Sequence, residues 1–256
     1  HAFIRNNGEV KPEGQRPIPD SEQTIAEGLR KRGYATGAFG KWGLGGPGTE
    51  GDPVYQGFDR FFGYNCQRHA HSYYPSYLWS NKIRVTLNNK PPVPGHASLP
   101  KGADSKDPRS YDIFKGKDYA PDRINEQALK FIRANKDKPF FCYLPITPPH
   151  GIFDIPDSDP AWADYKNKDW PEPARRYAAM VGMVDRQVGQ VLDLLNESYG
   201  ISTDIRAEAL EHILLGMHVK RRRFFLTERA QSFPAFAGPL QFHVRGHDVV
   251  DGDAGL

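Results

Sequence analysis

Residues 35–46 read Ala-Thr-Gly-Ala-Phe-Gly-Lys-Trp-Gly-Leu-Gly-Gly, a run of small and β-prone residues that ends in a glycine-rich turn around one lysine, Lys41. We expect a strand over residues 34–39 and a turn over residues 40–46. Ligands of open α/β sheets bind just beyond the carboxyl ends of strands, and a lysine placed there is a point charge suited to an anion. A solvated lysine in a tight turn is the simpler alternative, because glycine clusters are common at turns.

A helix is predicted immediately before this strand, over residues 21–32. Asp20 or Ser21 is a suitable N-cap, and Gly33 supplies the left-handed residue that ends many helices. A helix followed by a strand and a glycine-bounded lysine forms an α/β unit. The stretch therefore predicts an α/β fold with Lys41 as a candidate anion-binding residue.

A second unit of the same kind lies much further along the chain. A helix is predicted over residues 122–136, and the continuously apolar run 139–147 is typical of a strand that is buried on both faces of a sheet. This predicted strand is followed by Pro148-Pro149-His150-Gly151, a rigid turn that contains one ionisable side chain, His150. Lys41 and His150 thus occupy equivalent positions, and we expect both at one edge of the sheet as parts of one site.

The segment between the two units, residues 47–121, is predicted to be mostly loop. Its aromatic stretch 57–64 is expected to pack beneath the loop as a small cluster. Residues 77–87 are expected to form a short pair of strands around Asn81-Lys82. The remainder, residues 88–121, mixes proline, glycine and lysine and is expected to be exposed.

His69 and His71 lie in this loop at spacing i, i+2, which places both side chains on the same side of an extended chain. The pair fits three interpretations, namely two ligands of a metal ion, a site that faces a substrate, or structural hydrogen bonding. A metal ion would need further ligands, and the sequence does not locate them.

The longest periodic element is a helix predicted over residues 173–196, whose apolar side chains repeat every three or four positions and mark a core helix. The character of the chain changes after Glu197. Residues 206–215 are compatible with one more helix. The basic run Lys220–Arg223 is interpreted as a solvated stretch rather than as a nucleic-acid site.

Composition argues against several classes of protein. The 256 residues suffice for one large domain or two small ones, and 22 prolines and 25 glycines predict long loops. A net charge of +3 is too small to indicate nucleic acid, and no apolar run approaches the ~18 residues of a membrane helix. No signal peptide is visible. Cys66 and Cys142 form one bridge or none.

Five segments, in order along residues 1–197, resemble the sulfatase family, the formylglycine-dependent sulfuric ester hydrolases of the alkaline-phosphatase-like superfamily. They are residues 24–36, the glycine-lysine stretch 40–45, the glycine-phenylalanine-aspartate stretch 56–64, the strand 139–144 with Thr147-Pro148-Pro149-His150, and the helix 177–195. The resemblance implies an α/β fold with a mixed sheet flanked by helices, incomplete at both ends in this chain. It also implies hydrolysis of sulfate esters by the parent enzyme.

The resemblance further implies roles for the two residues at the strand ends. Lys41 would hold a sulfate oxygen and offset the charge that develops in the transition state, and His150 would protonate or hydrogen-bond the leaving-group oxygen. The family lysine is often followed two residues later by a histidine, where this chain has Gly43. His69 or His71 is expected to take its place as a substrate-binding residue, with His71, beside the tyrosines, preferred.

The sequence contains no recognisable site for calcium or formylglycine, which the intact family uses. Formylglycine arises from the Cys or Ser of Cys/Ser-x-Pro-x-Arg, and neither Cys66 nor Cys142 has this context. The aspartates and the Asp-Asn pair of the calcium site are also missing, so that a hard cation has too few oxygen ligands. We therefore expect no metal site and little or no activity from this polypeptide alone.

The sequence thus predicts a partial sulfatase catalytic domain over residues 1–197 and a divergent tail over residues 198–256 that is either frame-shifted or disordered. The expected substrate is a small-molecule or carbohydrate sulfate ester, with no nucleic-acid or membrane partner. Hydrolysis of phosphate or phosphonate esters and anion binding without catalysis are the alternatives, because Lys41 and His150 do not distinguish between tetrahedral anions. The resemblance implies a periplasmic or secreted protein.

Overall fold

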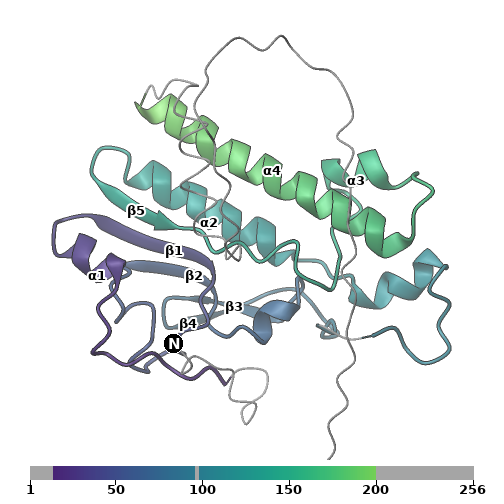
Figure 1. Ribbon diagram of the computed structural model, residues 1–256, viewed down its shortest axis with the longest axis horizontal. Coiled ribbons are helices and arrows are strands. Elements are labelled where there is room, and N and C mark those ends of the chain that lie inside the picture. Colours follow the sequence, from purple (N-terminus) through teal and green to yellow (C-terminus); the bar gives the residue numbers. More distant parts are fainter. Residues whose placement is uncertain (1–13, 96–97, 200–256) are drawn as a thin grey trace, which may run out of the picture. The chain divides into compact units, whose positions relative to one another are not determined.

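Five strands form one mixed sheet in the order β4-β3-β2-β1-β5 (Figure 1). The computed structural model describes residues 14–95 and 98–199. The strands are β1 (Ala35–Lys41), β2 (Arg60–Tyr64), β3 (Tyr77–Ser80), β4 (Ile83–Thr86) and β5 (Phe140–Tyr143). β1 pairs in parallel with both β2 and β5, whereas β3 pairs antiparallel with β2 and with β4. The mixed sheet predicted from the sequence is therefore confirmed.

Helices cover both faces of this sheet. They are α1 (Ile25–Arg30), α2 (Ala120–Ala134), α3 (Pro160–Tyr165), α4 (Glu172–Tyr199) and the short 3-10 helices η1 (His69–His71) and η2 (Pro108–Phe114). Phe39 of β1 packs into the cluster beneath α2, while its neighbour Ala38 packs with Ala26 of α1. Because successive side chains of a strand point to opposite faces, α1 and α2 lie on opposite faces. α4 packs against α2 and α3 (Figure 1).

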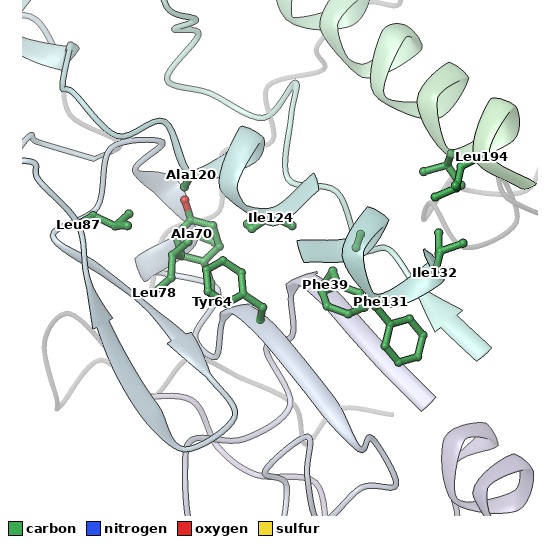
Figure 2. Packing of buried hydrophobic residues seen from close by; sticks show 13 residues of the cluster. Phe39, Tyr64, Ala70, Leu78, Leu87, Ala120, Ile124, Phe131, Ile132 and Leu194 are labelled. Carbon is green, nitrogen blue, oxygen red and sulfur yellow. The ribbon is translucent and has the colours of Figure 1, made fainter. Parts of the chain in front are cut away.

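The main core lies between the sheet and α2, and it holds β1 in place. Figure 2 shows the rings of Phe39 and Phe131 close together, with their centroids 5.3 Å apart. Ile132 of α2 lies toward Leu194 of α4 in the same view, so that α4 joins this core through α2. Aromatic pairs of this kind add about 0.5–1.5 kcal/mol beyond the apolar area they bury. β1, which carries Lys41 at its end, is therefore anchored through the Phe39 side of the sheet.

Two glycines let three chain segments approach one another at the carboxyl edge of the sheet. Gly40 and Gly63 face each other in the pairing of β1 with β2, and both have positive φ angles, +141° and +152°. A Cβ at position 63 would overlap the Gly40 carbonyl oxygen, and a Cβ at position 40 would overlap the Pro145 carbonyl oxygen. Glycine is therefore required at both positions by space as well as by backbone conformation.

Several elements begin or end away from their predicted boundaries. The first helix begins at Ile25 rather than near Ser21, because Thr24 and Glu27 form a capping box in which each side chain accepts a hydrogen bond from the other residue's N–H. The first strand extends to Lys41, so that the lysine is the last residue of the strand rather than part of the turn. The hairpin predicted over residues 77–87 and the helix predicted over residues 173–196 are confirmed.

Three stretches within the segment predicted to be mostly loop are regular structure, namely residues 60–64 (β2), 69–71 (η1) and 108–114 (η2). β2 was not predicted because its neighbouring residues Phe61 and Phe62 are both apolar, although their side chains point to opposite faces of the sheet. Phe61 packs toward the α1 face and Phe62 toward the α2 face, so that both positions are apolar. A strand covered on both faces does not show the period-two pattern of polar and apolar residues.

The expectation that the second apolar run is a strand buried on both faces is wrong. β5 is only four residues long, all four are half-buried, and it lies at the end of the strand order with β1 as its neighbour. An edge position explains the exposure, because no other strand within residues 14–95 and 98–199 covers its outer side.

Other predictions can be checked more briefly. Cys66 and Cys142 are both free thiols, so the alternative of no bridge holds. The helix predicted over residues 206–215 and the divergent tail lie outside the described residues, apart from the tail's first two positions, which belong to α4. In the described part of the chain, no helix is long and apolar enough to cross a membrane.

Candidate functional site

Lys41 lies at the carboxyl end of β1, between the two strands that pair with β1 in parallel. Its backbone N–H donates a hydrogen bond to the Pro145 carbonyl oxygen at 3.0 Å, which ties the lysine to the segment that follows β5. The side chain is half-buried, and burial lowers the pKa of the ammonium group from its ordinary value. No acidic side chain of the described residues forms an ion pair with it. A half-buried cation without a carboxylate partner is suited to bind a mobile anion.

His150 follows β5, the other parallel neighbour of β1, and is exposed. The carboxyl ends of the parallel neighbours β1 and β5 lie at one edge of the sheet, where Lys41 is the last residue of β1 and His150 lies in the loop that follows β5. The His150 ring atom Nδ1 lies 3.0 Å from the Gly151 carbonyl oxygen. A carbonyl oxygen only accepts, so Nδ1 carries a proton in this contact.

His71 stacks on His150, whereas His69 is buried elsewhere. The two stacked rings have centroids 4.9 Å apart and planes 15° apart. His69 packs against Tyr64 and Tyr77, with ring centroids 5.4 Å and 4.4 Å away. Burial, assisted by the positive charge of Arg84, lowers the pKa of His69 to about 4, so this ring is neutral near pH 7.

The idea that His69 and His71 point to the same side is wrong for a local reason. The two residues begin and end the 3-10 helix η1 rather than an extended segment. In a 3-10 helix, residues two positions apart lie on different sides, because each turn has three residues. η1 therefore brings His71 to His150 and leaves His69 in the interior.

Three buried side chains hold the backbone of the His150 loop. The Tyr73 hydroxyl donates a hydrogen bond to the His150 carbonyl oxygen. Further along the loop, the Tyr119 hydroxyl donates to the Asp154 carbonyl oxygen at 2.9 Å, and Arg176 of α4 donates to the Ile155 carbonyl oxygen at 2.7 Å. The position of His150 is therefore set by the tyrosines around η1 and α2 and by the arginine of α4.

Arg176 is the centre of a buried ion-pair network at the start of α4. Its Nε lies 2.9 Å from Glu172 Oε1, and its Nη2 lies 2.6 Å from Asp157 Oδ1. Its guanidinium group also lies 3.7 Å from the ring centroid of Trp162. The side chains of Arg176 and Glu172 are only 5% and 3% exposed, so their charges depend on ion pairs for compensation, and Glu172 has a second partner in Arg175.

Asp154 adds a carboxyl group to this network. It lies 3.8 Å from Arg176, and its Oδ2 atom has no hydrogen-bond partner among the described residues. Burial raises the pKa of Asp154 to about 7, although the charge of Arg176 opposes the increase. The loop between His150 and α3 therefore contains a carboxyl group whose ionisation is costly near neutral pH.

A Tyr73→Phe variant tests how the loop is held. Tyr73 is 4% exposed, and removing its hydroxyl leaves the His150 carbonyl oxygen without this donor. We expect a loss of about 1 kcal/mol of unfolding free energy and a shift of the His71 and His150 ring resonances in NMR spectra. Tyr111→Phe is the matched control, because its hydroxyl donates to Ser105 on the surface. Unchanged ring resonances in Tyr73→Phe would contradict this description.

The described residues do not fit the metal or the nucleophile of the intact family. They contain no group of three or more His, Cys, Asp or Glu side chains that could hold a metal ion. The two thiols are unsuited as activated nucleophiles, because Cys66 is buried and burial raises the pKa of Cys142 to about 12. No Cys/Ser-x-Pro-x-Arg sequence occurs in the 256 residues.

A hollow of about 540 Å³ lies away from the candidate residues. It is lined by Tyr34, Lys136, Asp137, Lys138, Pro139, Phe140 and Tyr199. Tyr34 and Pro139 precede β1 and β5, so the hollow is at the amino ends of these strands, opposite the edge that carries Lys41 and His150.

Lys41 and His150 stand out in the sequence, whereas the residues that hold the His150 loop do not. Tyr73, Asp154 and Arg176 were not singled out, although Tyr73 was noted as a neighbour of His71. The contact of Arg176 in α4 with the loop after His150 cannot be predicted from the local sequence of either segment. A buried arginine within the apolar periodicity of a helix is the signal that identifies Arg176.

Comparison with known proteins places this chain in a family. The family model described as Sulfatase matches residues 3–200. N-acetylgalactosamine-6-sulfatase from Homo sapiens is 29% identical over 184 residues, which cover 70% of this chain and 30% of that protein. Arylsulfatase G from Rattus norvegicus is 26% identical over 195 residues, which cover 69% of this chain and 33% of that protein. The chain thus spans about a third of the length of these relatives.

Solved structures agree on the fold. The crystal structure of Ps i-CgsB in complex with k-i-k-neocarrahexaose superimposes with a TM-score of 0.54 at 23% identity, covering 71% of this chain and 38% of that one. At this identity the likeness concerns the arrangement of sheet and helices. The match of the family model to residues 3–200, well over half of the chain, shows that the chain belongs to the sulfatase family.

Proposed function

We propose that this chain carries part of the active site of a sulfate-ester hydrolase, within a partial catalytic domain over residues 1–197. The observation that carries the proposal is Lys41, a half-buried cation at the carboxyl end of β1 that forms no ion pair within the described residues. It ends a strand that pairs in parallel with β5, and His150 follows β5 with His71 stacked on its ring. A cation and an imidazole pair at one sheet edge suit an anionic ester and its leaving group.

The proposed roles divide charge binding from proton transfer. The ammonium group of Lys41 binds a sulfate oxygen and stabilises the negative charge that grows in the transition state. Its partial burial strengthens this interaction, because fewer water molecules screen the charge. His150, with Nδ1–H directed at the Gly151 carbonyl, donates a proton from Nε2 to the leaving-group oxygen. His71 keeps the plane of the His150 ring fixed by stacking.

The proposed substrate is a small-molecule or carbohydrate sulfate ester. N-acetylgalactosamine-6-sulfatase, to which the chain is similar, supports this choice by its name. We further propose that the parent protein is exported, as the family resemblance implies. Calcium and formylglycine belong to the proposal only for the intact family, because the described residues fit neither.

A Lys41→Met variant tests the anion site directly. We expect the 256-residue chain to bind methyl sulfate in an NMR titration, and Lys41→Met to bind at least about tenfold more weakly, because a hydrogen bond to a charged group contributes about 1.5–3 kcal/mol. Lys41→Arg keeps the charge and should retain part of the affinity. Lys138→Met is the matched control, since Lys138 is exposed at the opposite edge of the sheet.

The same titration separates the alternatives. Tighter binding of methyl phosphate than of methyl sulfate would favour phosphate or phosphonate esters as the substrates. Equal binding of methyl sulfate by wild type and Lys41→Met would overturn the proposed site, because its main charge would then contribute nothing.

A further inference from the structure

The turn after Lys41 contains a glycine whose missing side chain leaves room for another residue. Gly43 has a φ of +78°, and its N–H donates a hydrogen bond to the Asn65 carbonyl oxygen at 3.1 Å. A Cβ at position 43 would lie 2.6 Å from Gln67 Cγ and 3.0 Å from Gln67 Nε2. The side chain of Gln67 therefore packs against the turn at Gly43, which is two positions after Lys41 in the sequence. It occupies the space that a side chain at position 43 would need.

The carboxamide of Gln67 is available to a ligand. Gln67 is partly exposed, and its side chain forms no hydrogen bond with any residue in the described part of the chain. Its backbone N–H approaches the Gln15 side-chain oxygen at 3.5 Å, which helps to fix the backbone without using the side chain. An amide that has no partner among the described residues and lies against the turn that follows a half-buried lysine is a candidate donor to an anion.

Asn65 is a second carboxamide at the same end of β2, with unsatisfied hydrogen-bonding groups. It is 1% exposed, and neither its Oδ1 nor its Nδ2 has a hydrogen-bond partner among the described residues. A buried polar group without a partner costs about 1–3 kcal/mol, so such groups are usually explained by bound water, an ion or a function. Asn65 directly follows Tyr64, which pairs with Lys41 in the sheet register. This end of β2 is therefore more polar than packing requires.

We propose that Gln67 is a further substrate-binding residue of the anion site, with its Nε2–H donating a hydrogen bond to an oxygen of the sulfate group held by Lys41. This inference rests on the proposed function and extends it. Because a carboxamide is neutral, Gln67 adds a donor without adding a positive charge. A sulfate monoester carries one negative charge, whereas a phosphate monoester carries nearly two above pH 6. The neutral donor is thus suited to the sulfate ester.

Three variants distinguish hydrogen bonding from packing. Gln67→Ala removes the donor, and we expect methyl sulfate to bind about tenfold more weakly. Gln67→Glu has nearly the same shape but places a carboxylate beside the anion, so we expect it to bind more weakly still. Gly43→Ala leaves Gln67 in the sequence but displaces its side chain, and we expect a loss like that of Gln67→Ala. Gln190→Ala is the control, because Gln190 lies on the exposed surface of α4.

The experiment is an NMR titration of each variant of the 256-residue chain with methyl sulfate, after thermal unfolding has shown that the variant is folded. A shift of the Gln67 side-chain amide signal on titration of the wild type is expected as well. Wild-type affinity of Gln67→Glu would overturn the inference, since a residue that only packs tolerates an isosteric change. If Lys41→Met loses binding while every Gln67 variant retains it, the inference fails and the proposed function stands. If Lys41→Met also binds normally, both fail.

Discussion

The Arg176→Met variant should lose about 3–5 kcal/mol of unfolding free energy at pH 8, because the buried Asp154 carboxyl group loses its neighbouring cation and the buried Glu172 carboxylate loses one of its two arginine partners. Glu172 is 3% exposed and Arg176 is 5% exposed at the side chain, so little water is available to replace the lost partner. The change also removes the hydrogen bond to the Ile155 carbonyl oxygen, which helps to hold the segment after His150. Methionine fills much of the same volume, so that a cavity is not the main cause.

The loss should depend on pH in a definite direction. In the wild type the pKa of Asp154 is raised to about 7, above its ordinary value of 3.8, so ionising it costs stability as the pH rises through that range. Arg176 opposes this shift, and its removal raises the pKa further. Below pH 5 the Asp154 carboxyl group is protonated with or without Arg176, and this part of the penalty disappears. The deficit of Arg176→Met should therefore be smaller at pH 5 than at pH 8.

Urea unfolding at both pH values measures this difference. Arg123→Met on α2 is the matched control, because the Arg123–Asp118 pair is exposed and such pairs contribute at most about 1 kcal/mol. A deficit below 1 kcal/mol at pH 8, or an equal deficit at both pH values, would contradict the account of the network.

The Gly63→Ala variant should be destabilised by about 3 kcal/mol or more, because a methyl group there overlaps the carbonyl oxygen of Gly40 on the neighbouring strand. The backbone at Gly63 has a φ of +152°, so strain adds to the overlap. β1 and β2 would have to separate at the edge that carries Lys41. We therefore expect weaker binding of methyl sulfate in whatever fraction remains folded.

Gly46→Ala provides the comparison for this prediction. A Cβ at Gly46 meets no atom within 4 Å, and its φ is not positive. We expect Gly46→Ala to change the unfolding free energy by less than about 0.5 kcal/mol. Thermal unfolding followed by circular dichroism measures both variants. Similar stabilities for Gly63→Ala and Gly46→Ala would show that the close approach of β1 and β2 is not required.

The long or strongly patterned elements and the short hairpin β3–β4 could be predicted from the sequence, whereas other short elements could not. The helix Glu172–Tyr199 was predicted because its apolar period continues over many turns. β2 was missed because its five residues have apolar side chains on both faces. β5 was predicted as a strand buried on both faces, but its place at the end of the strand order depends on the other strands of the sheet and not on its own composition.

At the candidate site, the residues at the strand ends could be predicted, whereas their mutual arrangement could not. Lys41 and His150 stand out in the sequence because each comes after an apolar run and has glycine or proline residues beside it. The stacking of His71 on His150 depends on η1, a single 3-10 turn without a distinctive sequence signal. The contact of Gln67 with the turn at Gly43 joins residues far apart in the chain and depends on an absent side chain. No periodic pattern in the sequence indicates such a contact.

The pairing of β1 with β5 also has a consequence for the order in which the chain folds. Strands β1 to β4 lie close together in sequence, whereas β1 and β5 are separated by roughly 100 residues, and closing so long a loop carries a greater entropic cost. We therefore expect β5 to dock late, after the strand that presents Lys41 is already in place. The segment with His150 would then reach the sheet only in the final stage of folding. In partly folded chains, Lys41 would be in place at the end of β1 while His150 is not.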